Sequence, residues 1–98
     1  MIKTTQELLR DIADRAKASR LALNLTQMGL EQRSGVSLGT IKKFEHTGKI
    51  SLESLLKIAA ALGATKEFEV LFSESTTGQV SIDDLLKQPK KRKRGSLT

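Results

Sequence analysis

The chain has 98 residues and 38% of them are hydrophobic, which predicts one small domain that a partner subunit would help to stabilise. It has no cysteine, which excludes a disulfide framework and a thiolate metal site. Because the first residues lack an apolar signal region and no apolar run approaches about 18 residues, we expect a cytoplasmic protein with no membrane contact. Three phenylalanines, without tyrosine or tryptophan, disfavour single-strand binding by base stacking.

A first helix is predicted from Thr4 to about Leu23. Thr4 and Glu7 have the spacing of a capping box, T-x-x-E. An apolar face is predicted from the helical spacing of Leu8, Leu9, Ile12, Ala16 and Leu23. The charged residues of this segment are expected on the outer face: Asp11, Asp14, Arg15, Lys17 and Arg20. Asn24 ends this helix.

Two short helices joined by a tight turn are predicted between Leu25 and Glu45. Thr26 is a suitable N-cap for the first of them, and Ser37 for the second. Gly35 lies where the first helix should stop, since glycine adopts the left-handed conformation of many helix ends. The apolar residues expected to hold the two helices together are Leu30, Val36, Ile41 and Phe44.

A loop with Gly48 as its flexible point should follow, and Ser51 should cap a fourth helix that ends at Gly63. Its apolar residues at helical spacing are Leu52, Leu55, Leu56, Ala59 and Leu62. Thr65 should cap a short fifth helix with Phe68, Leu71 and Phe72 on one side.

The C-terminal part differs in composition from the rest of the chain. Residues 73–88 are predicted to be a linker with a short amphipathic piece, and residues 89–98 a disordered basic tail. From residue 87 onward there are six basic residues and no acid. This tail could improve solubility, clamp DNA without sequence preference, or face a protein partner, and its composition does not separate these roles.

The remaining charges are balanced overall but unevenly placed. Residues 33–49 hold four basic residues and one acid, whereas residues 66–86 hold one basic residue and five acids. This asymmetry favours one surface on a nucleic acid and another on a different partner.

The stretch LTQMGLEQRSGVSLGTIKKFE resembles the helix-turn-helix of the Xre/Cro family. The matching features are LTQ at the start, Gly35-Val36-Ser37 at the turn, Thr40-Ile41, and Phe44-Glu45. The resemblance extends over roughly residues 12–72 and implies an all-α, five-helix, lambda-repressor-like DNA-binding domain, here residues 1–72 with a C-terminal extension. The positions that it implies for DNA contact are Thr26, Gln27, Ser37, Leu38, Gly39, Thr40, Lys42, Lys43 and Lys49.

Three positions carry further expectations from this resemblance. Gln27 matches a glutamine that binds a DNA phosphate, and Arg20 matches an arginine expected to brace the helix pair or reach a phosphate. Glu31 stands where the family usually has alanine, close to the other helix. The glutamate must therefore swing outward, or the helix pair must open slightly.

The implied function is a sequence-specific, double-stranded DNA-binding transcriptional repressor that acts as a homodimer on a palindromic operator. The wider pattern is similar to HipB-like antitoxins, which repress their own operon and hold a HipA-like kinase toxin. Two alternatives remain: a toxin-neutralising module with secondary DNA binding, and a phage-type repressor without a toxin. We find no catalytic constellation, metal site or cofactor motif, and His46 has no second histidine beside it in the sequence.

Overall fold

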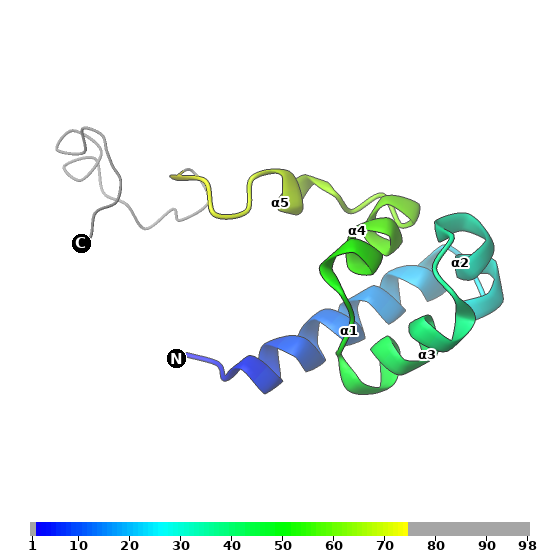
Figure 1. Cartoon of the computed structure of the whole chain (residues 1–98), viewed down its shortest axis with the longest axis horizontal. Helices are drawn as coiled ribbons and strands as arrows, with labels where there is room; N and C mark the ends of the chain where they lie inside the picture. Colours follow the sequence, from blue (N-terminus) through cyan, green and yellow to red (C-terminus); the bar gives the residue numbers. More distant parts are fainter. Residues whose placement is uncertain (1, 75–98) are drawn as a thin grey trace, which may run out of the picture. The chain divides into compact units, whose positions relative to one another are not determined.

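A computed structural model of the chain describes residues 2–74, which contain five helices and no strand (Figure 1). The helices are α1 (Thr5–Ala22), α2 (Gln27–Ser34), α3 (Leu38–Thr47), α4 (Leu52–Ala61) and α5 (Lys66–Glu69). The all-α prediction is confirmed for these residues. None of these helices combines the length and apolar character that crossing a membrane requires. The predicted amphipathic piece, the basic tail and most of the predicted linker lie in residues 75–98, outside the described part.

The helices begin where the sequence places their capping residues. At Thr4 the capping box is complete: the hydroxyl accepts from the backbone N–H of Glu7, and the Glu7 carboxylate accepts from the backbone N–H of Thr4. Thr26, Ser37 and Ser51 each accept the backbone N–H three residues later, at 2.9, 3.2 and 3.1 Å. These bonds satisfy donors that lack a partner inside the helix, so four of the five predicted caps are confirmed, and the cap by Thr65 stays a prediction.

Left-handed residues follow four of the helices, the last of them Gly63 after α4 with a φ of 73°. Asn24 follows α1 with a φ of 59°, and Gly35 ends α2 with a φ of 79°, as expected. Gly48 ends α3 with a φ of 83° and is buried, so it is a close packing point rather than the flexible part of a loop. A Cβ atom there would lie 2.8 Å from the carbonyl oxygen of Leu9. Glycine is therefore required both by the backbone conformation and by the approach of α1.

A single apolar cluster joins the helices of the first unit, which extends to Thr65. Within this unit α3 packs on α1 and α2, and α2 also packs on α4. The fully buried members of the cluster are Ala13, Leu30, Val36, Ile41, Phe44 and Ile58. The four residues predicted to lock the helix pair together all belong to it.

The predicted inner face of α1 was partly wrong. Leu8, Ile12 and Leu23 are 46%, 37% and 48% exposed, whereas Ala13 is fully buried and Arg20 is only 6% exposed. The helix is rotated so that Arg20 points inward, because polar partners from other segments receive its guanidinium group.

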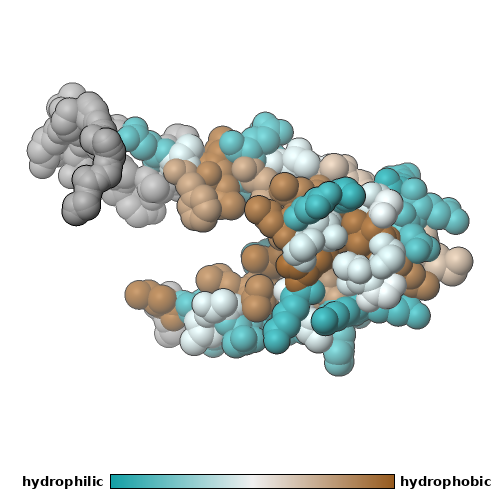
Figure 2. All heavy atoms as spheres, in the orientation of Figure 1, coloured by the Kyte–Doolittle hydropathy of each residue, from teal (hydrophilic) through white to brown (hydrophobic). Residues whose placement is uncertain are grey.

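The face predicted for α4 is partly confirmed, since Ala59 is buried and Leu55 and Leu62 pack against the core. Leu52 and Leu56, however, are 62% and 37% exposed, and Ile58, which was not predicted, is buried. Figure 2 shows exposed hydrophobic side chains, in brown, among the hydrophilic side chains of the first unit. The spacing of apolar residues predicted a stripe along α4 that is wider than the part of this helix that its neighbours cover.

A second unit begins at Lys66 and contains α5. This helix ends at Glu69, so Leu71 and Phe72 lie beyond it and do not extend one helical face with Phe68, contrary to prediction. Phe72 has a φ of 69° and is 91% exposed.

Candidate nucleic-acid interface

The start of α3 is presented at the surface by the turn from Gly35 to Ser37. Ser37 caps the helix, and its hydroxyl also lies 2.9 Å from that of Thr40. The inner side of α3 is held by Ile41 and Phe44, which are buried in the core. Six of the predicted contact residues are exposed: Thr26, Ser37, Gly39, Lys42, Lys43 and Lys49. The other three are half-buried: Gln27, Leu38 and Thr40.

Gly39 leaves open space on the outer side of α3. A Cβ atom placed on it would have no other atom within 4 Å. Lys42 and Lys43 follow one turn later and are both exposed. This part of α3 therefore offers a shallow, cationic surface, of a size that the major groove of DNA admits.

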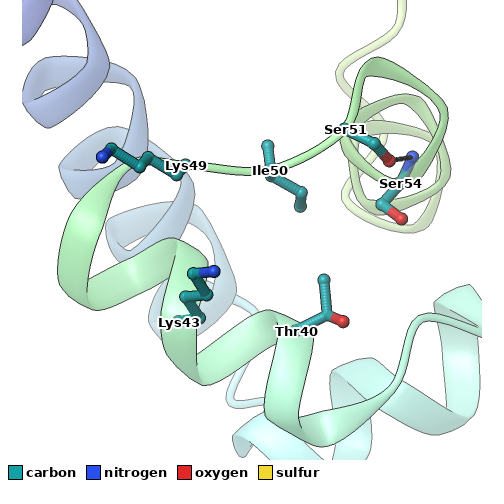
Figure 3. Close-up of a pocket in the computed structure, with 6 residues that line it drawn as sticks. All are labelled: Thr40, Lys43, Lys49, Ile50, Ser51 and Ser54. Atoms are coloured by element: carbon teal, nitrogen blue, oxygen red, sulfur yellow. Dashed lines mark hydrogen bonds between the residues drawn. The ribbon is translucent and has the colours of Figure 1, made fainter.

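A hollow of about 370 Å³ lies between α3 and the first turn of α4. Its lining residues are Thr40, Lys43, Lys49, Ile50, Ser51 and Ser54. Figure 3 shows Thr40 and Lys43 on α3, Ile50 on the connecting loop, and the Ser51 hydroxyl bonded to the Ser54 backbone N–H. The positive end of the α4 dipole and two lysines make this hollow favourable for an anion such as a phosphate.

The structure thus brings three predicted residues together with three that the sequence did not indicate for binding. Thr40, Lys43 and Lys49 come from the prediction, and the other three are Ile50, Ser51 and Ser54. Of these, Ser51 was interpreted only as a helix cap. The sequence did contain a usable signal, because a lysine two residues before an N-cap serine lies near the positive end of that helix.

A buried ion pair connects α1 to α3. The guanidinium group of Arg20 donates from Nε to Oε2 of Glu45 at 2.8 Å and from Nη2 to Oε1 at 3.0 Å. Its Nη1 donates to the carbonyl oxygen of Leu25 at 2.8 Å, just before α2. Arg20 therefore holds α1, α3 and the start of α2 together, which confirms the bracing role expected for it.

Gln27 belongs to the same network. Its Nε2 donates to Oε1 of Glu45 at 3.0 Å. Burial raises the pKa of Glu45, but the hydrogen bonds from Arg20 and Gln27, with the charges of Arg20 and Lys17, more than offset this effect and leave the pKa below its ordinary value. Since an amide nitrogen carries two hydrogens, the Glu45 bond leaves Gln27 a second donor.

Arg10 secures the other end of α3. Its Nη1 donates to the carbonyl oxygen of His46 at 2.6 Å, and its Nη2 to that of Glu45 at 2.5 Å. A cation at the carbonyl end of a helix is favourable, because the dipole is negative there. The sequence indicated no such role for Arg10, which lies 36 residues from His46 along the chain.

Glu31 is half-buried, and its side chain is directed at the start of α3. Its carboxylate Oε2 accepts the backbone N–H of Leu38, the first residue of α3, at 3.0 Å. The backbone carbonyl of Glu31 accepts from Gly35 at 2.8 Å and closes α2. One residue therefore both ends α2 and caps α3.

Two short helices, a left-handed glycine between them and an exposed cationic second helix define a helix-turn-helix. Residues 17–69, more than half of the chain, match the Helix-turn-helix family. The protein belongs to this Xre/Cro-type family of DNA-binding transcription regulators. A search of curated proteins found no significant match.

Proposed function

We propose that the protein is a repressor that binds a specific double-stranded DNA sequence through α3. The observation that carries this proposal is the exposed start of α3 beside the cationic hollow. In this arrangement Ser37, Leu38 and Lys42 meet base edges in the major groove, where the first residues of a recognition helix reach deepest. Gly39 adds no side chain and lets the helix approach the bases closely.

The remaining proposed contacts are to the DNA backbone. Lys43, Lys49 and Thr40 line the hollow and receive one phosphate there, next to the N-terminus of α4. At the start of α2, Thr26 and Gln27 receive a second phosphate. Two backbone anchors of this kind set the register of α3 in the groove.

A binding assay with the DNA upstream of the protein's own gene tests the proposal. We expect a complex that random DNA of equal length does not displace. Lys43→Ala should weaken binding to both DNAs several-fold, because it removes one phosphate contact. Lys57→Ala is the matched control, since Lys57 is an exposed lysine of α4 that pairs with Glu53 and lies off the hollow. Equal binding to both DNAs would contradict sequence recognition.

We also propose a homodimer on a palindromic operator. Support comes from exposed apolar residues that one small unit does not bury, Leu71 and Phe72 among them, and from Ile82, Leu85 and Leu86 in the segment that is not described. A two-fold dimer would place two copies of α3 about 34 Å apart, one turn of DNA. Sedimentation should show a dimer at tens of micromolar, and a monomer with and without DNA would contradict it.

The biological role that we propose is that of an antitoxin which represses its own operon in the cytoplasm, on the nucleoid. Its partner would be a HipA-like kinase toxin. Support comes from the stretch that begins at LTQ and extends to the leucines of α4, because this stretch is similar to HipB-like antitoxins. Co-expression with a kinase gene adjacent to its own tests this role. We expect a stable complex and loss of toxicity, and the absence of any such gene would instead favour a repressor without a toxin.

A further inference from the structure

Three helix starts of the first unit differ in the side chains that cap them. At α2 and α4 only a hydroxyl, from Thr26 or Ser51, accepts a backbone N–H of the first turn. At α3 the Ser37 hydroxyl does the same, and the carboxylate of Glu31 also accepts the Leu38 N–H. Of these three helices, α3 is the one that has a full negative charge bound at its positive end.

Among residues 2–74, no cation forms an ion pair with the Glu31 carboxylate, whereas the Glu45 carboxylate is held by two bonds from Arg20. Glu31 is half-buried, which weakens the screening of its charge by solvent. At the start of α4, Lys43 and Lys49 line the hollow, and Glu53 in the first turn pairs with Lys57 and does not line it.

We propose that Glu31 is a specificity-determining positioning residue, which excludes phosphate from the start of α3 and directs it to the start of α4. This inference rests on the proposed DNA binding. If a duplex approaches with a phosphate at Leu38, the Glu31 carboxylate repels that phosphate. The free energy of this complex therefore rises. In the intended register the phosphate enters the hollow at Lys43, and bases rather than phosphates face the start of α3. Glu31 therefore weakens unspecific binding more than specific binding.

The hydrogen bond adds a second effect. It fixes the direction in which α3 leaves the turn, because it joins a side chain of α2 to the first N–H of α3. Removing the acceptor frees this N–H and loosens the start of α3, whereas removing only the charge does not. The two effects are separable, since glutamine keeps an acceptor oxygen in the same place and loses the charge.

The test compares Glu31→Gln and Glu31→Ala with wild type on the upstream DNA and on random DNA, at two salt concentrations. Glu7→Gln is the matched control, because Glu7 also caps a helix start and the change in net charge is the same. A unit charge about 7 Å from a phosphate changes binding roughly threefold in water. We expect Glu31→Gln to tighten binding to random DNA about threefold at low salt, with a smaller change on upstream DNA and at higher salt.

Exchange of the Leu38 backbone amide gives a readout without DNA. It should remain slow in Glu31→Gln and become fast in Glu31→Ala, which should also bind the upstream DNA more weakly. If Glu31→Gln behaves like Glu7→Gln on both DNAs while wild type binds, the inference is overturned and the proposed function stands. If wild type binds no duplex, the proposed function fails and the inference fails with it.

Discussion

The ion pair between Arg20 and Glu45 should be the polar contact on which the first unit depends most. Both side chains are almost fully buried, at 7% and 6% exposure, and are joined by two charge-assisted hydrogen bonds. Replacing Arg20 by methionine leaves the Glu45 carboxylate buried with only Gln27 as a donor. Breaking a buried pair in this way costs about 3–5 kcal/mol. Since small domains have roughly 5–15 kcal/mol of stability in total, the variant should be close to unfolding at 37 °C.

Urea unfolding followed by circular dichroism measures this cost. We expect Arg20→Met and Glu45→Leu each to be strongly destabilising, and the double variant to be more stable than either, because it buries no unpaired charge. The control is Glu53→Gln, which breaks an exposed pair with Lys57 and should cost less than about 0.5 kcal/mol. If Arg20→Met costs no more than Glu53→Gln, the pair does not brace the helices and our reasoning is refuted.

The same pair predicts how stability depends on pH. The pKa of Glu45 in the folded chain lies below its ordinary value of 4.5, so the unfolded chain takes up a proton first as the pH falls. The stabilisation is therefore complete above about pH 4.5 and is lost as the pH falls through the lower, folded pKa. Glu45→Gln should unfold with a shallower acid dependence than wild type, and identical acid profiles would contradict the lowered pKa.

Other predictions concern the DNA surface and two glycines. Lys42→Ala should relax base preference by about 1–3 kcal/mol at one or two positions per half-site, and Lys43→Ala should weaken all sequences alike; a randomised operator library shows whether these roles are reversed. In thermal unfolding, Gly39→Ala should stabilise the folded chain by up to about 1 kcal/mol, because the added Cβ atom meets no other atom. Gly48→Ala should destabilise it by about 1–3 kcal/mol or more, because position 48 has a positive φ and the added Cβ atom would clash with Leu9. Removing residues 89–98 should flatten the salt dependence of binding by up to about four or five units per chain if the tail contacts phosphates, and an unchanged slope would exclude that role.

The sequence by itself determined the features that depend on near neighbours. Thr4, Thr26 and Ser37 cap helices through bonds to residues three positions away, so their roles follow from local spacing. Gly35 likewise marks a helix end because its own backbone conformation requires it. The spacing of the apolar residues in α2 and α3 was also sufficient to identify the buried part of the helix pair.

Tertiary structure decided the features that join distant segments. Arg20 was expected on the outside because a charged residue favours water, yet it is buried because Glu45, 25 residues away, supplies a matching charge. Leu52 has the spacing of a core residue but is exposed, since spacing does not say how far the neighbouring helices reach. The approach of Gly48 to Leu9 and the hollow beside Lys43 likewise arise only when separate segments pack together, and no pattern within a single helix contains that information.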